Sequence, residues 1–426
     1  MMKLMPPPPA SEEEEARGRT RRRRGSTSTV SASSSSSSSS EEETKTKTPP
    51  TPIPLPVPSP PYWPKGQHPT CEIRIPTGTD HPHPPPTVTY TVQQALGKGC
   101  FARVYYAEPT SHAHQQTCRP FALKLVHTKT HNQANQFLRE WHAYRRLNTM
   151  GKALDMYPSS LLRYYEHHTL PGNLAYFVMD LIPSLTLEDY INHEWRRRQR
   201  KKEDHGTPIP DELFSPALVF YLMRQLSQAV AFMHEAGAAH LDIKPANISF
   251  DPVERQVKLF DLGFACCRPL VEEGPTDQPF RVSTRVGTPL YFAPEQLRCV
   301  RDNDDSAACG KAATYDFDPF PADVWQLGHV FYILMTGQHV FEDCCTDMQD
   351  LHTTLFFTRP SPLLHPVVKR YPDYQELLSK TLCCYQAPML RIKAGPLDTL
   401  VRFLSARHPL PQGLLLLQST ATTMEA

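Results

Sequence analysis

One short polar stretch, His240 to Asn247 (HLDIKPAN), constrains this chain more than any other feature of its sequence. It places the carboxylate of Asp242, the ammonium of Lys244 and the amide of Asn247 on one loop between apolar segments. A second carboxylate, Asp261, follows fourteen residues after Asn247, at the end of a predicted strand. Carboxylate and amide oxygens are ligands that Mg²⁺ accepts. A chance grouping of polar residues without a function explains this cluster poorly. We therefore interpret it as a site that binds a metal ion and carries out a reaction.

Two further features with phosphate-binding chemistry lie upstream. The segment Gly97 to Val104 (GKGCFARV) separates two predicted strands, and glycines let backbone amides approach phosphate groups closely. Alone this signal is weak, because Ala102 takes the third glycine position and an ordinary hairpin explains it equally well. Lys124 stands among apolar residues, where burial is costly without an anion such as Glu140 on the next predicted helix. A lysine that reaches solvent from an edge strand is the alternative.

From Thr87 the pattern predicts strands first and helices later, which indicates a two-lobed α+β architecture. Runs rich in β-branched and aromatic residues predict strands at 88–96, 102–109, 120–127, 161–165 and 175–181, with a short pair near 248 and 258. Apolar residues at helical spacing predict helices at 133–147, 220–235, 322–336 and 374–383. Two polar stretches, 195–211 and 301–317, resemble insertions.

Residues 1–86 differ sharply from the rest. Of 426 residues 44 are proline, many of them in this segment, which also holds a serine tract, Ser33 to Ser40. Too few apolar residues recur there to build a core, so we predict a disordered tail. Its proline-rich part favours an extended conformation that SH3 or WW modules bind, although a simple spacer is equally consistent. We therefore predict a tail at 1–86, a folded domain at 87–407 and a short tail at 408–426.

Net charge and cysteine content limit the binding partners and the cellular compartment that we expect for this protein. The net charge of +1 gives no reason to expect nucleic acid as a partner. Two basic runs, Arg17 to Arg24 and Arg196 to Lys202, can bind acidic partners or direct nuclear import, but solvated charge is the simpler reading. The 11 cysteines form no CxxC pattern, and we see neither a secretory signal nor an apolar run that could span a membrane. We expect a cytoplasmic or nuclear protein with reduced thiols that is not secreted.

Taken together and in this order, these residues resemble the eukaryotic protein kinase family over about residues 90–405. The resemblance implies a two-lobed fold with a β-rich N-lobe and a helical C-lobe. It also implies that the protein binds ATP and Mg²⁺ and phosphorylates protein substrates on Ser or Thr. On this basis Asp242 is the catalytic base, Lys244 contacts the γ-phosphate, and Asn247 and Asp261 hold the metal.

The resemblance also assigns a nucleotide site. Lys124 binds the α- and β-phosphates and Glu140 is its ion-pair partner, while the hinge that binds adenine follows Met179. The full predicted set is Leu96, Gly97, Lys98, Gly99, Cys100, Phe101, Ala102, Arg103, Val104, Ala122, Lys124, Glu140, Asp180 and Ile182. Further landmarks are 287–295 (GTPLYFAPE), 323–328 (DVWQLG) and Arg391, which the resemblance pairs with Glu295. Lys244 and Thr288 favour Ser/Thr over Tyr as the acceptor.

The chain departs from the family pattern at two instructive positions. Leu241 replaces the arginine that usually precedes the catalytic aspartate and receives the phosphate of the activation loop. Thr284 matches the residue that is usually phosphorylated, so we hypothesise that activity does not depend strictly on its phosphorylation. Arg281 or Arg285 could compensate for the missing arginine. Ser249 stands beneath the expected adenine ring, where the family usually has an apolar side chain.

Two other classes of function compete with an active protein kinase. A pseudokinase scaffold would keep the fold, bind nucleotide and recruit partners, but it has no need for all of Lys124, Glu140, Asp242, Asn247 and Asp261. A small-molecule kinase on the same fold is disfavoured by the complete segment 287–295. The sequence assigns no subfamily, substrate or upstream regulator.

Overall fold

The computed structural model describes residues 70–74, 87–98, 102–110, 119–170, 173–182, 185–205, 212–269, 280–297, 316–341, 361–382 and 391–409. All of them belong to the unit Pro61–Ala426. The predicted tails, 1–86 and 408–426, lie outside the described residues except for 70–74 and 408–409.

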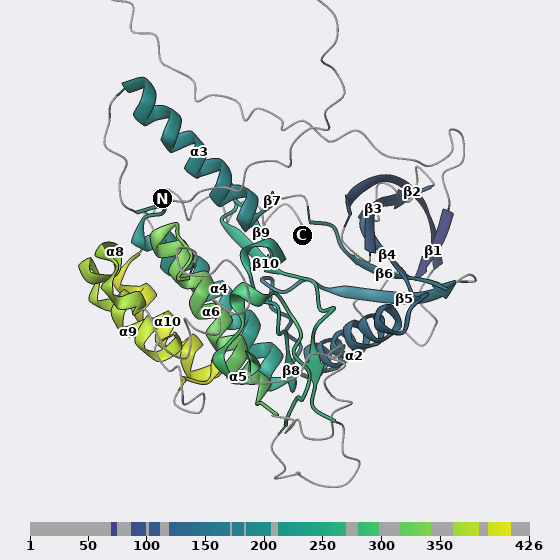
Figure 1. Ribbon diagram of the computed structural model, residues 1–426. Helices are drawn as coiled ribbons and strands as arrows, with labels where there is room; N and C mark the ends of the chain where they lie inside the picture. The colour runs from purple at the N-terminus through teal and green to yellow at the C-terminus, as the bar shows by residue number, and fades with distance from the viewer. Residues whose placement is uncertain are drawn as a thin grey trace, which may run out of the picture. The chain divides into compact units, whose positions relative to one another are not determined.

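An antiparallel sheet of six strands forms the first half of the described chain, seen at the right of Figure 1. Its order is β1-β2-β3-β4-β6-β5, with β1 at Thr70–Arg74, β2 at Thr87–Lys98, β3 at Ala102–Pro109, β4 at Phe121–His127, β5 at Tyr164–Leu170 and β6 at Leu174–Asp180. Alternate residues of β2, namely Val88, Tyr90 and Val92, are buried, as expected for a strand with one face on a core.

Helix α2 (His131–Ala153) lies between β4 and β5 in the chain. Helices and two small sheets make up the second half, where the longer helices are α3 (Leu187–His205), α4 (Pro216–Glu235), α6 (Pro319–Thr336), α9 (Pro372–Thr381) and α10 (Ala394–Arg407). Shorter ones are α5 (Pro294–Leu297), α8 (Pro366–Arg370), and the 3-10 helices η1 (Pro245–Asn247), η2 (Pro289–Tyr291) and η5 (Pro362–Leu364). The small sheets are β10-β9-β7 and β11-β8, built from β7 (Leu185–Thr186), β8 (Ala238–Ala239), β9 (Ile248–Asp251), β10 (Gln256–Leu259) and β11 (Cys266–Cys267).

Local sequence explains where the central helix α6 begins and ends. The side chain of Asp318 accepts a hydrogen bond from the Phe320 amide and Pro319 opens helix α6, while Gly337 ends it at φ +73°. A left-handed residue of this kind is the usual helix terminator. Every residue of α6 from Ala322 to Thr336 is buried, so this helix lies at the centre of the helical half (Figure 1).

The predicted α+β class, with strands first and helices following, is confirmed. Three details differ. Residues 70–74, predicted as tail, form a strand because their backbone pairs with the free edge of β2 over five residues. Strand β5 begins at Tyr164, since Leu161 makes only an isolated bridge, to Leu259. The first predicted insertion is helical up to His205, as part of α3. No helix of the described residues is long and apolar enough to span a membrane.

Candidate active site

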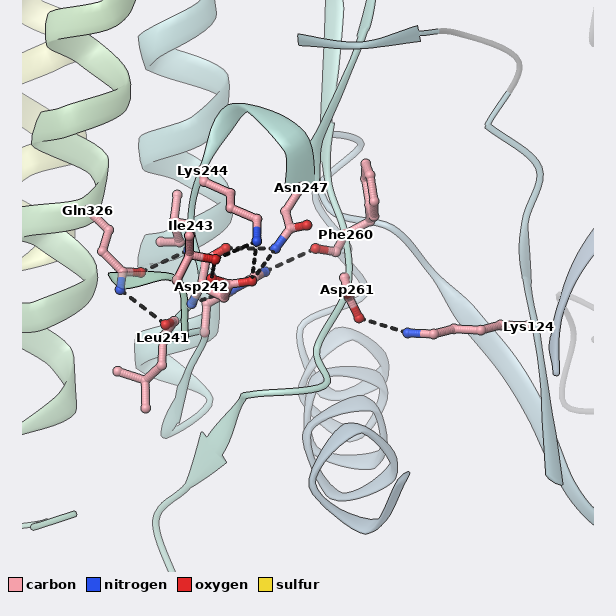
Figure 2. Close-up of polar contacts among 11 residues, drawn as sticks. Lys124, Leu241, Asp242, Ile243, Lys244, Asn247, Phe260, Asp261 and Gln326 are labelled. Carbon is pink, nitrogen blue, oxygen red and sulfur yellow. Dashed lines mark hydrogen bonds and ion pairs between the residues drawn. The ribbon is translucent and has the colours of Figure 1, made fainter. Parts of the chain in front are cut away.

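The loop that carries Asp242 joins β8 to η1 and is held by helix α6. The carboxylate of Asp323 accepts hydrogen bonds from the amides of His240 and Leu241, at 2.8 and 2.7 Å. The amide of Gln326 accepts from the Ile243 amide at 2.8 Å and donates to the Leu241 carbonyl at 3.1 Å (Figure 2). Two fully buried side chains of one helix therefore determine the path of this loop.

The loop needs this support because its backbone is strained. Leu241 has φ +63° and its side chain is fully buried, and a left-handed conformation costs a residue with a Cβ about 1–2 kcal/mol. Gly287, at φ +108°, packs directly against it, and a Cβ at this position would collide with the Leu241 carbonyl oxygen. The glycine is therefore required both by its backbone conformation and by the space available.

Asp242 lies at the centre of a small polar network and is 2% exposed. Its Oδ1 accepts a hydrogen bond from the Thr288 hydroxyl at 2.6 Å, and its Oδ2 accepts from the Asn247 amide nitrogen at 2.8 Å. The ammonium of Lys244 lies 2.9 Å from Oδ2 and donates to the Thr288 hydroxyl at 2.5 Å. A buried carboxylate held by three donors is fixed in position and remains an acceptor.

Lys124 forms ion pairs with two carboxylates, those of Glu140 and Asp261. Its Nζ lies 2.7 Å from both Glu140 Oε1 and Asp261 Oδ1, and Glu140 also accepts from the Tyr164 hydroxyl at 2.9 Å. Strand β4 supplies the lysine, helix α2 the glutamate and the segment after β10 the aspartate, whose contact with Lys124 is drawn in Figure 2.

Burial and charge act in opposite directions on these groups. Burial opposes the charge of Lys124, but the carboxylates of Asp261 and Glu140 outweigh it and raise the pKa of Lys124. Burial would likewise raise the pKa of Asp261, yet the Lys124 ammonium and a hydrogen bond from the Gly263 amide hold that pKa below its usual value. Lys124 is therefore a permanent cation at neutral pH, and Asp261 a permanent anion.

A cavity of about 660 Å³ opens beside these residues. Most of the predicted nucleotide and catalytic residues line it: Leu96, Gly97, Lys98, Ala102, Val104, Ala122, Lys124, Asp180, Ile182, Asp242, Lys244 and Asp261. Gly99, Cys100 and Phe101 lie outside the described residues. Arg103 was predicted to line the site, but the structure corrects this. It is exposed on β3 between Ala102 and Val104, because successive side chains of a strand point to opposite faces.

Several lining residues were missed by sequence reasoning, among them Gln136, Leu162, Tyr164, Thr186 and Phe264. No local pattern identifies them, since each comes from a different element and reaches the cavity only through packing. Ser249, predicted beneath the adenine ring, does line the cavity and is 3% exposed.

Oxygens of Asn247 and Asp261 fit a magnesium ion. Asp261 lines the cavity, and Asn247, which is not among the lining residues, contacts Asp242, which is. The Asn247 amide nitrogen donates to both the Asp242 carbonyl and its carboxylate, which directs the amide oxygen away from Asp242 (Figure 2). Asp261 uses Oδ1 for Lys124 and keeps a second carboxylate oxygen. Among the described residues no cluster of three His, Cys, Asp or Glu side chains could hold a metal alone. Magnesium is usually held by one or two protein oxygens, with phosphates and water completing its shell, and this donor set suits that mode.

The remaining landmarks lie apart from the cavity. The guanidinium of Arg391 makes two hydrogen bonds to the Glu295 carboxylate, one of them at 3.0 Å, in a pair whose arginine side chain is fully buried. Thr284 lies in the wall of a different cavity, which Arg281 also lines and Arg285 does not.

Comparisons with known proteins agree with this geometry. Residues 90–394 match the family described as the protein kinase domain. Serine/threonine-protein kinase ppk16 of Schizosaccharomyces pombe is 26% identical over 292 residues, covering 68% of this chain and 33% of that protein. Calcium/calmodulin-dependent protein kinase type 1 of Caenorhabditis elegans is 26% identical over 257 residues, covering 60% and 58%. Serine/threonine-protein kinase PLK4 of Drosophila ananassae is 28% identical over 296 residues, covering 69% and 30%. The chain thus spans less than two thirds of each relative.

Proposed function

Because the chain belongs to the protein kinase family, whose members use ATP and Mg²⁺, we propose that it transfers the γ-phosphate of ATP to serine or threonine hydroxyls of other proteins. The observation that carries this proposal is the network around the buried Asp242, in which Lys244, Asn247 and Thr288 hold the carboxylate. A scaffold that only binds nucleotide gains nothing from such a network, whereas phosphoryl transfer requires a fixed acceptor for the substrate proton.

Each polar residue of the site has a defined task in this reaction. The Asp242 carboxylate accepts the proton of the attacking hydroxyl. Lys244 neutralises charge on the transferred group, and Lys124, fixed between Glu140 and Asp261, binds the upstream phosphates. Asn247 and Asp261 would hold Mg²⁺, which when bound neutralises charge on the phosphates and orients them. The protein contributes mainly position and preorganised charge.

Preference for serine and threonine rests on Thr288 and Lys244. The Thr288 hydroxyl donates to Asp242 and accepts from Lys244, so the three side chains form one continuous chain of hydrogen bonds beside the base. This arrangement keeps the lysine ammonium close to the point where a short aliphatic hydroxyl must approach. The Ser/Thr kinases among the relatives support the same preference.

The proposal is tested with purified full-length protein, Mg-ATP labelled in the γ-phosphate, and a generic protein substrate. Wild type should incorporate phosphate on Ser and Thr, and Asp242→Asn, which keeps the side-chain shape, should lose this activity. Thermal unfolding of both proteins shows whether the variant is folded. Equal incorporation by the two proteins refutes the role of Asp242. Nucleotide binding without incorporation by either protein would instead establish the scaffold alternative.

Two further proposals concern residues that the structure does not describe. The proline-rich segment before residue 70 is proposed to bind SH3 or WW modules, which a pull-down with isolated modules tests. A cytoplasmic or nuclear location is proposed as well, with Arg17 to Arg24 as the import signal, and imaging of a variant with this run neutralised tests it.

A further inference from the structure

A second cavity, of about 1000 Å³, lies between helix α2 and two later segments, 265–269 and 280–286. It shares no lining residue with the nucleotide cavity. We call it the arginine groove, because Arg139, Arg145, Arg146, Arg268 and Arg281 all line it, while Glu235 is the one acidic residue among the described residues of its lining. The mechanism proposed above uses none of these residues.

The carboxylates of the described residues do not neutralise the positive charge of the arginine groove. Among the described residues, none of the five arginines forms an ion pair with a carboxylate. Arg146 donates to the carbonyls of Ala236 and Gly237, at 3.2 and 3.5 Å. Arg145 lies 5.3 Å above the Trp141 ring and Arg268 lies 5.7 Å from the Phe320 ring, contacts that keep the full charge. Five guanidinium groups around one cavity, without a carboxylate partner in the described part of the chain, favour an anionic ligand.

The shape of the arginine groove favours a peptide over a compact anion. The α2 residues that line it recur every three or four positions from Asn135 to Ala153, which places them on one face of the helix. At a rise of 1.5 Å per residue this stripe is about 27 Å long. An extended peptide advances about 3.3 Å per residue, so roughly eight residues match its length. A single phosphate or a small phosphorylated metabolite would leave most of it empty.

We propose that the arginine groove binds an extended acidic segment of a partner protein, with phosphoserine or glutamate side chains at its centre. Apolar residues at its ends would contact Leu138, which is 42% exposed, and Met150, which lies near the other end of the α2 stripe. Phosphoserine and glutamate match the planar, multidentate donors of arginine. The groove thus selects both charge and an extended shape.

The arginine groove is positioned to influence phosphoryl transfer. This coupling rests on the proposed kinase function. One wall is α2, which carries Glu140 and through it orients Lys124. The opposite wall, 280–286, leads directly into Gly287 and Thr288, which contact the loop of Asp242. A peptide that bridges both walls would hold these two elements in the geometry described here.

The test measures binding by fluorescence anisotropy, with full-length protein first treated with phosphatase. The probe is a labelled peptide, Leu-Glu-Glu-phosphoSer-Glu-Glu-Glu-Leu, and its control carries Gln and Ser at the charged positions. We expect saturable binding of the acidic peptide and none of the neutral one. Arg139→Gln and Arg281→Gln should each weaken binding about tenfold, the loss expected for one charge-assisted contact. Arg224→Gln, at an exposed arginine of α4 outside the groove, should leave it unchanged.

Thr284→Ala, compared with wild type that has not been treated with phosphatase, distinguishes a partner segment from a phosphate on the chain's own Thr284. Unchanged peptide binding by this variant supports the proposal. Absence of binding to phosphatase-treated wild type, or equal affinity of the Arg139, Arg281 and Arg224 variants, overturns it. Because binding requires no turnover, its failure is separate from failure of the kinase proposal, which Asp242→Asn tests.

Saturating peptide should also raise the initial rate of phosphate incorporation, and Arg281→Gln should lose this response at the same peptide concentration. An unchanged wild-type rate overturns the coupling to the active site.

Discussion

His329 provides a quantitative test of how the helical core responds to acid. Its side chain on α6 is 1% exposed, and neither ring nitrogen has a hydrogen-bond partner among the described residues. Aromatic rings surround it, with centroids 5.0 Å away for Phe341 and 5.7 Å away for Trp325 and Tyr291. Burial, with a smaller effect of His339, lowers the pKa of His329 to about 3.

The sign of the pH effect follows from this lowered pKa. In the unfolded chain a histidine has a pKa of about 6.5, so below that pH the unfolded state gains a proton that the folded state refuses. Stability from the neutral His329 is therefore complete above about pH 6.5 and is lost as the pH falls toward the folded pKa of about 3. Between about pH 7.5 and pH 5 the loss from this one residue is about 2 kcal/mol. His339, whose pKa is lowered to about 4 by burial, acts in the same direction.

The assay compares urea unfolding of wild type and His329→Leu by tryptophan fluorescence at about pH 7.5 and pH 5. The packing change in the variant is present at both pH values and cancels in the difference. The fall in unfolding free energy between the two should therefore be about 2 kcal/mol smaller in the variant. His127→Leu, at an exposed histidine, should lose as much stability as wild type. Equal losses for His329→Leu and wild type would refute the inference that His329 is neutral and buried in the folded state.

Three further substitutions test the site and its support. Gly287→Ala should lower phosphate incorporation about 100-fold, because the new Cβ displaces the Leu241 carbonyl. Gly395→Ala is the control and should have normal activity, because a Cβ added at Gly395 meets no atom within 4 Å. Lys124→Met should lower incorporation by a similar factor of about 100 without unfolding the protein by circular dichroism, since the loss is of phosphate binding. Arg391→Ala leaves a carboxylate without its buried partner and should lower unfolding free energy by about 3 kcal/mol in a urea titration.

The polar cluster around Asp242 was predictable because its residues are close in sequence or belong to a recurrent motif. Asp242 and Asn247 are five positions apart on one loop, and their contact follows from that loop alone. A buried lysine such as Lys124 needs an anionic partner, so the carboxylate of Glu140 on the next helix was a reasonable inference. The segment from Gly287 to Glu295 was recognised only as a landmark of the family, and the collision that makes Gly287 indispensable is visible only in three dimensions.

Other features had no sequence signal. Arg103 lies within a motif whose neighbours line the cavity, yet the alternation of β3 turns it outward. Tyr164 bonds Glu140 across 24 positions, and no local pattern relates them. The strand at 70–74 forms because β2 offers an open edge, a condition set by the sheet and not by the five residues themselves.

The sequence by itself determined the α+β class, the order of the elements and the polar cluster around Asp242, because periodicity and short loops act over a few residues. Tertiary structure decided which charges remain unneutralised and which polar groups are buried. The arginines of the groove come from α2 and two distant segments, and His329 is enclosed by rings from three parts of the chain. Burial and charge depend on every neighbour in space, so these properties arise only when the elements have packed.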